Sequence, residues 1–110
     1  MTDTVSNVSI PSHRLVRLIL LAIQEVPGVV RLGTIPQTNT VGVTTGKGAV
    51  IRMSDRGVIA NCYIVAVLGV HLLELGVALQ ATVAAVIRDM AGMVVREVNV
   101  YIQDVEAKRG

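Results

Sequence analysis

Hydrophobic residues recur at the spacing of an α-helix in two parts of the chain. The first part reads HRLVRLILLAIQEV and stops at Pro27, which cannot continue a helix. The second runs from about Leu72 to about Ala91, and Gly92 closes it. Each part keeps Leu, Ile, Val and Ala on one side, so the pattern predicts two helices that share a hydrophobic core.

Alternation of apolar and polar residues predicts four strands around these helices. A short strand is expected at Val5 to Ile10, and two more flank the turn SDRG, where Asp and Gly favour a tight hairpin. The last strand reads VVREVNVYIQDV. Residues 31–48, between the first helix and the hairpin, are polar and have no sustained period, so a long loop is expected there.

The predicted order of elements is β-α-β-β-α-β. This order indicates an α+β fold, a two-layer sandwich with two helices on one face of a mainly antiparallel four-stranded sheet. A single domain is expected over residues 1–110, with frayed ends at 1–4 and 106–110. The other face of the sheet would be open to water or to a partner. On this outer sheet face we expect Asn61, Tyr63, Asn99, Tyr101 and Gln103.

The composition favours a packed aliphatic core, since 52% of the residues are apolar, 16% are charged, and Phe and Trp are absent. Two helices over one small sheet cannot bury every apolar residue. The remainder is expected to form a contact surface for a second copy or for another protein. It lies near Leu20, Leu21, Leu73 and Val77.

The longest apolar window runs from Ile64 to Ile87, but His71, Glu74 and Gln80 interrupt it. A charged residue near the middle of a membrane span costs about 2.5–3.5 kcal/mol, so we expect no transmembrane segment in this chain. The single cysteine, Cys62, cannot form an internal disulfide, and no signal-peptide pattern opens the sequence. A reducing, cytoplasmic setting is therefore expected.

The stretch TNTVGVTTGKGAV, residues 38–50, resembles a phosphate-binding loop. Such a loop needs G-x-x-x-x-G-K-[ST] between a strand and a helix. Val41 stands in place of the first glycine, Gly48 stands in place of the hydroxyl residue, and a strand pattern follows. We therefore expect a linker that ends in Lys-Gly, without a nucleotide.

Other candidate chemistry is sparse. His71 and Glu74 could share a helix face, but they supply two ligands where a metal site needs three or four, so a histidine at a helix start is expected. Cys62 has apolar neighbours and is expected in the core. Ser12 and His13 are adjacent without the geometry of a catalytic triad. We expect no catalytic residue, cofactor or metal, and no enzyme activity.

Three sequence motifs match those of a known family in their order and in their residues. They are EVPGV after the first helix, KGAVIRM leading through a hairpin to CYIVAVLGV, and MAGMVVREVNVYIQDV after the second helix. From about Val8 to Val105, the chain resembles the alkaline shock protein, or envelope stress response protein, family of Gram-positive-type bacteria. The resemblance implies a non-enzymatic cytosolic protein that forms homo-oligomers and gathers at the membrane through a membrane-anchored protein partner. The second helix carries fewer charges than is typical of that family.

The β-α-β-β-α-β order is also that of RNA-binding sheets, which stack bases on aromatic residues. Here Tyr63 and Tyr101 alone could stack bases, and the net charge of +2 comes from scattered basic residues. An RNA-binding adaptor that uses the outer sheet face is therefore the alternative function, although no nucleic acid is expected as a partner.

Overall fold

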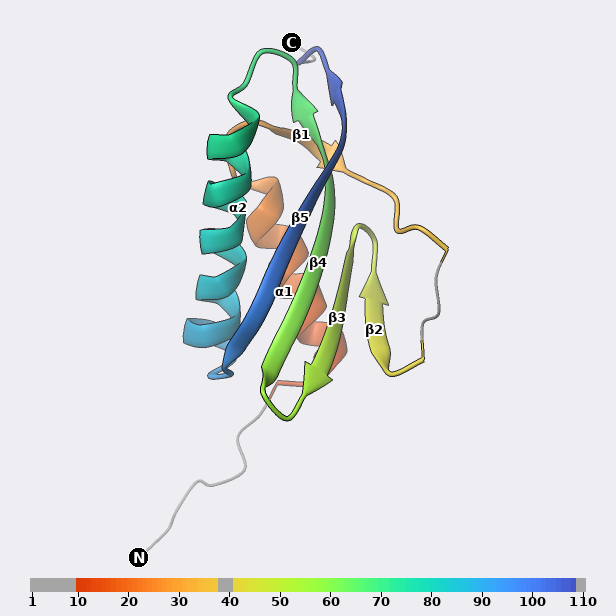
Figure 1. Ribbon diagram of the computed structural model, residues 1–110, viewed down its shortest axis with the longest axis vertical. Coiled ribbons are helices and arrows are strands. Elements are labelled where there is room, and N and C mark those ends of the chain that lie inside the picture. The colour runs from red at the N-terminus through yellow and green to blue at the C-terminus, as the bar shows by residue number, and fades with distance from the viewer. Residues whose placement is uncertain (1–9, 38–40, 109–110) are drawn as a thin grey trace, which may run out of the picture.

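The computed structural model describes residues 10–37 and 41–108, which form two layers (Figure 1). The elements are α1 (Ser12–Gln24), β1 (Val29–Leu32), β2 (Val43–Gly46), β3 (Ala49–Ser54), β4 (Gly57–Val67), α2 (Leu72–Ala85), the π-helical turn η1 (Val86–Met90) and β5 (Val95–Glu106). Both helices cover one face of an open, mainly antiparallel sheet of five strands. The predicted α+β fold is therefore confirmed.

The core lies between the helices and the inward face of β4. It contains the apolar stripes that the sequence predicted, and no polar or charged side chain of the described residues is buried there. Burial of this aliphatic surface, at about 25 cal/mol per Å², is the main force that holds the layers together. The buried side chains of the helices and of β4 include Leu15, Ile19, Ile23, Leu75, Leu79, Val83, Ala60, Cys62, Ile64 and Ala66.

The strand β4 is the centre of the sheet. One side of β4 pairs antiparallel with β3 over its first half and with β1 over its second half. The other side pairs with β5, which runs parallel to β4 because α2 carries the chain back to the starting end of the sheet. The strand β5 is therefore one edge of the sheet, and the opposite edge is formed by β2, which pairs with β3, and by β1, which pairs with the second half of β4.

The predicted hairpin between β3 and β4 is confirmed. Ser54 pairs with Gly57 at its closed end, and the Ser54 hydroxyl donates to the Gly57 carbonyl over 2.7 Å. Gly57 has a φ of +124°, and a Cβ there would lie 2.6 Å from the Val94 carbonyl oxygen. Glycine is therefore required where the hairpin meets the start of β5.

The long loop expected at residues 31–48 is wrong in part. Arg31 and Leu32 belong to β1, and Val43–Gly46 form β2. Both strands are four residues long, too short to give a clear period, and they are formed by pairing with distant strands. The Lys-Gly pair is the turn between β2 and β3, where Gly48 has a φ of +89°.

Further expectations concern the two ends of the chain and the number of strands. The strand expected at Val5 to Ile10 lies outside the described residues, except for Ile10, which is not in a strand, so the described order is α-β-β-β-β-α-β. The sheet has five strands rather than four because β1 and β2 join it. Of the frayed tail expected at 106–110, Glu106 lies within β5, because a salt bridge to Arg31 on β1 holds it. The ends at 1–4 and 109–110 lie outside the described residues.

Candidate interaction surfaces

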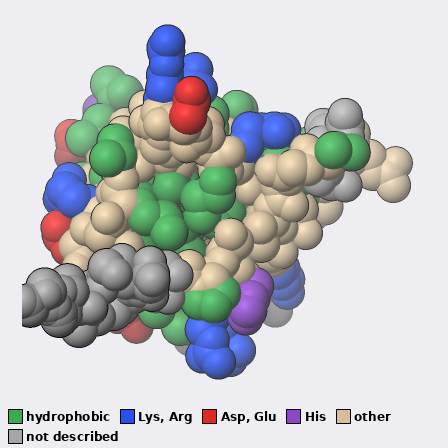
Figure 2. Space-filling view, turned by 90° about the horizontal axis from the view of Figure 1, so that it is seen from below, with side chains coloured by type: hydrophobic (Ala, Val, Ile, Leu, Met, Phe, Trp, Pro, Cys, Tyr) green, Lys and Arg blue, Asp and Glu red, His purple; other side chains and the backbone are tan. Residues whose placement is uncertain are grey.

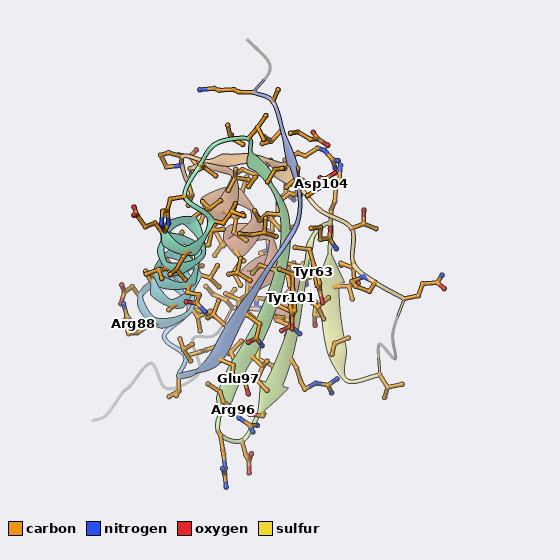
Figure 3. The ribbon with its side chains drawn as sticks, turned by 45° about the horizontal axis from the view of Figure 1, so that its top comes forward. Tyr63, Arg88, Arg96, Glu97, Tyr101 and Asp104 are labelled. Atoms are coloured by element: carbon orange, nitrogen blue, oxygen red, sulfur yellow. The ribbon has the colours of Figure 1, made fainter. Side chains whose placement is uncertain are left out.

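The outer sheet face brings together the residues predicted to lie there, and Figure 3 shows Tyr63 and Tyr101 side by side on it. Because β4 and β5 run parallel and in register, like side chains stand opposite one another, with Asn61 beside Asn99 and Tyr63 beside Tyr101. Gln103 follows on β5. The alternation of polar and apolar residues along both strands causes this arrangement, because it turns the aliphatic side chains to the helices.

The tyrosine pair is stacked. The ring centroids of Tyr63 and Tyr101 lie 4.9 Å apart with an interplanar angle of 13°. Burial raises the pKa of Tyr63, and the charges of Tyr101 and Cys62 raise it further. Tyr101 remains 47% exposed. Each ring thus covers one face of the other, which fixes their orientation while leaving part of the pair accessible.

The asparagine pair is joined by hydrogen bonds between side chains. Asn99 Nδ2 donates to Asn61 Oδ1 over 2.9 Å and to Glu97 Oε1 over 3.2 Å. Together with the tyrosines, this pair makes a rigid strip of polar and aromatic groups across β4 and β5.

Gln103 reaches from β5 across to the segment after β1. Its Oε1 accepts from the Thr34 N–H over 2.8 Å, and its Nε2 donates to the Thr34 carbonyl over 2.7 Å. This contact needs Gly33, since a Cβ at that position would collide with Gln103 Oε1 and lie 3.0 Å from the carbonyl carbon of Tyr63. The Gly33 N–H meanwhile donates to the Tyr63 carbonyl over 2.7 Å. Gln103 therefore serves as a clamp on the segment that follows β1.

A salt bridge between Arg31 and Glu106 stands beside this clamp, and the sequence did not reveal it. Arg31 donates from Nη2 to Glu106 Oε2 over 2.7 Å and from Nε to Oε1 over 3.3 Å. The hydrogen bond and the charge of Glu106 raise the pKa of Arg31. The residues are 75 positions apart, so no local spacing could have indicated the pair.

The apolar contact residues fall into two groups. Leu73 and Val77 are 74% and 57% exposed on α2, as predicted, and Leu21 is 56% exposed on α1. Leu20 does not belong with them. It is half-buried beside Gly46 of β2, because the missing side chain of that glycine lets α1 approach the strand.

A further apolar patch lies at the end of the molecule where α1 begins and the β3–β4 hairpin turns. Figure 2 shows hydrophobic side chains gathered at the centre of this end, among backbone and polar atoms. A depression of about 300 Å³ opens there, and its lining includes Met53, Val58, Met93 and Val94. The sequence did not single out this patch.

The remaining candidates have structural roles. His71 Nδ1 accepts from the Glu74 N–H over 3.2 Å and so caps the start of α2. The Glu74 carboxylate lies 3.7 Å from the same nitrogen, but an ion pair there needs a protonated Nδ1, which could not cap the helix, so the capping bond is the better description. Cys62 is fully buried in the core, as predicted, and burial raises the pKa of its thiol to about 12.

Within residues 10–37 and 41–108, no three His, Cys, Asp or Glu side chains gather as a metal site would require. None of the described helices is both long and apolar enough to cross a membrane. A depression of about 320 Å³ beside β1 is lined by Arg31, Thr34, Lys47 and neighbouring residues, without an acid, a histidine or a cysteine.

A comparison with known protein families identifies the family of this chain. The family model of alkaline shock protein 23, described as having a cell envelope-related function, matches residues 1–107. The chain belongs to this family. A search of curated proteins found no match to this chain.

Among solved structures, two zinc forms of a MamM CTD are similar at 18% identity, with TM-scores of 0.47 and 0.46. The first alignment covers 87% of this chain and 85% of the other, and the second covers 88% and 86%.

Proposed function

We propose that the chain is a non-catalytic protein of the cytoplasm that serves the cell envelope by assembly. Copies of the chain associate with one another and dock to a membrane-associated protein partner. Membership of the alkaline shock family over residues 1–107, with its cell envelope-related function, carries this proposal.

The outer sheet face supports docking. Its side chains come from two strands in register and are held by the stack of Tyr63 on Tyr101 and by the bond from Asn99 to Asn61. Side chains that are already ordered lose little entropy when a partner binds, so a rigid strip of this kind favours binding. Exposed Tyr101 would supply the apolar part of the contact.

The described titratable groups support a role without catalysis. The thiol of Cys62 is buried and its pKa of about 12 keeps it protonated, so it is a poor nucleophile. His71 Nδ1 is occupied by the capping bond of α2. The stacked tyrosines also give the RNA-binding alternative less support, because a face of each ring that would receive a base is covered by the other ring.

Membrane retention and self-association test the proposal together. We expect the full chain to sediment with the membrane fraction of its cells but not with protein-free phospholipid vesicles. Tyr101→Ala should lower this retention, whereas Leu21→Ala, at a residue of similar exposure on α1, should not. Light scattering should show association as the concentration rises from micromolar to near-millimolar. A chain that stays monomeric and remains in the supernatant would refute the proposal.

A further inference from the structure

We propose that two copies of the chain pair edge to edge through β5, antiparallel about Val100, so that their sheets join into one. The pairing rests on the self-association proposed above and names its surface. Three features of this edge favour a second copy as its partner: the backbone of β5, the charges on β5 and the helix beside it.

Between Glu97 and Ile102, the free edge of β5 lacks most of the features that usually protect an edge strand, apart from the contact with α2. Such edges are commonly shielded by proline, by bulges, by inward-pointing charges or by short length. Between Glu97 and Ile102, β5 contains no proline and keeps a regular register with β4. Its inward side chains there, Val98, Val100 and Ile102, are aliphatic and half-buried.

A hydrogen bond from α2 shows which backbone groups face this edge. Gln80 Nε2 donates to the Val98 carbonyl over 3.1 Å, so that carbonyl points away from β4. The backbone groups of a strand alternate in direction, which turns Val100 and Ile102 to the same edge. In an antiparallel pair about Val100, Val98 would meet Ile102 of the second copy. The Val98 oxygen has two lone pairs, so it can keep its bond to Gln80.

The charges on β5 complement a second copy in this register. Arg96 and Asp104 are both exposed, lie equally far from Val100 in the sequence, and stand at opposite ends of the strand (Figure 3). Register shifts at Val58/Ile59 and Ile64/Val65 bracket the regular part of the β4–β5 ladder. Antiparallel pairing would place Arg96 opposite Asp104 of the second copy, and the twofold symmetry would repeat this contact at the other end.

The helix α2 extends the same surface. The bond from Gln80 places the middle of α2 beside β5, and Figure 1 shows α2 standing next to that edge of the sheet. Residues at helical spacing from Gln80 share its side of the helix. These include Leu73 and Val77, which are 74% and 57% exposed. The same twofold axis would bring the two α2 helices together, antiparallel.

Two residues of opposite charge near the ends of α2, Glu74 and Arg88, would favour an antiparallel helix pair. Glu74 lies near the start and Arg88 just beyond the end, with no charged residue between them. Arg88 donates from Nε to Asp89 over 3.1 Å, and its terminal N–H groups have no partner among the described residues. The central residues Gly76 and Ala81 are small and would let the helices approach closely.

The helix faces are needed for a stable pair. A stable specific interface buries about 1,200–2,000 Å² in total, and the short regular part of β5 alone would bury less. Because the exposed apolar side of α2 lies beside the same edge, strand and helix can contribute to one continuous interface.

Charge reversal tests the β5 register. Sedimentation of the full chain should give a dimer, and Arg96→Asp or Asp104→Arg should each weaken it about tenfold, because each places like charges together twice. The combined variant restores opposite charges and should return to within about threefold of the wild type.

Substitution on α2 tests the helix contact. Val77→Glu should weaken the dimer by about tenfold or more, because it buries a charge in the interface. Leu21→Glu is the matched control, since Leu21 is 56% exposed on α1 and Val77 is 57% exposed on α2. It should leave the dimer unchanged.

The outcomes separate this pairing from the broader proposal. A strict monomer would mean that α2 merely shields the edge of β5, and would overturn both the pairing and the self-association. An oligomer that ignores the charge reversals and Val77→Glu would overturn the pairing alone. Weakening by each single reversal with rescue in the combined variant would establish it.

Discussion

At the scale of single residues, Gln103 holds the segment after β1 through two hydrogen bonds to the backbone of Thr34. Gln103→Ala would remove both hydrogen bonds to Thr34 and, because these bonds are exposed and water can replace them, should lower the free energy of unfolding by about 1 kcal/mol. Gln24→Ala is the control, because Gln24 makes one exposed bond within α1 and should cost less than about 0.5 kcal/mol. Urea unfolding measures both. Equal effects would contradict the clamp.

Cys62 links stability to alkaline pH. Burial raises the pKa of its thiol from 9.0 to about 12, so above pH 9.0 the unfolded chain loses this proton while the folded chain keeps it. The contribution of the buried thiol to stability is therefore fully present below pH 9.0 and is lost as the pH rises toward about 12. Cys62→Ala removes this titration. Between about pH 8 and about pH 10.5, urea unfolding should show the wild type losing about 2 kcal/mol more than the variant. Parallel losses in the two proteins would contradict it.

At the scale of elements, substitutions in the turn between β2 and β3 can distinguish a structural role of the glycine-rich stretch from a role in nucleotide binding. Gly48 has a φ of +89°, and a Cβ there would lie 3.0 Å from Leu32 Cβ. Gly48→Ala should destabilise the fold by about 1–2 kcal/mol, whereas Lys47→Ala should change it by less than about 0.5 kcal/mol. Thermal unfolding measures this. A large effect at Lys47, or stabilisation by ATP, would favour a phosphate site instead.

The sequence predicted the elements whose side chains repeat over many residues. The two helices, the β3–β4 hairpin and β5 are long or clearly periodic, so local pattern was enough. The strands β1 and β2 were not predicted, because their sequences, VVRL and VTTG, are only four residues long. Their extended structure depends on pairing, of β1 with β4 and of β2 with β3. Their pairing depends on tertiary contacts that a local window does not contain.

For the candidate surfaces too, features that follow from local sequence pattern could be predicted, and features that depend on tertiary contacts could not. Alternation placed Tyr63 and Tyr101 on one face, because each lies in a periodic strand. The stack between them needed the parallel register, which α2 creates. The clamp of Gln103 on Thr34 spans 69 positions, so only the folded chain reveals it. Leu20 was wrongly expected on the contact surface, because it packs beside Gly46 in a strand, β2, that the sequence did not predict.

At the scale of the whole molecule, the surfaces divide by face. The outer sheet face carries the tyrosine and asparagine pairs, while the exposed residues of α2 lie in the helix layer. Joining two sheets through β5 uses an edge and the helix layer, and leaves the outer sheet face uncovered. Self-association and docking to a partner can therefore occur together.

The joined sheet leads to a last prediction. A twofold axis perpendicular to the sheet leaves both outer faces on one side, so a dimer could hold two membrane-anchored partners at once. Two linked contacts bind far more tightly than one, because the second forms at a high effective concentration. Val77→Glu lies outside the outer sheet face, yet it should lower retention on the membrane fraction by about tenfold or more.

Tyr101→Ala should lower the same retention by direct loss of contact, while the dimer persists in sedimentation. Measuring both properties for each variant, with Leu21→Glu as the control, separates the two causes. If Val77→Glu abolished the dimer without reducing membrane retention, docking would need only one outer face, and the two faces of the dimer would not act together.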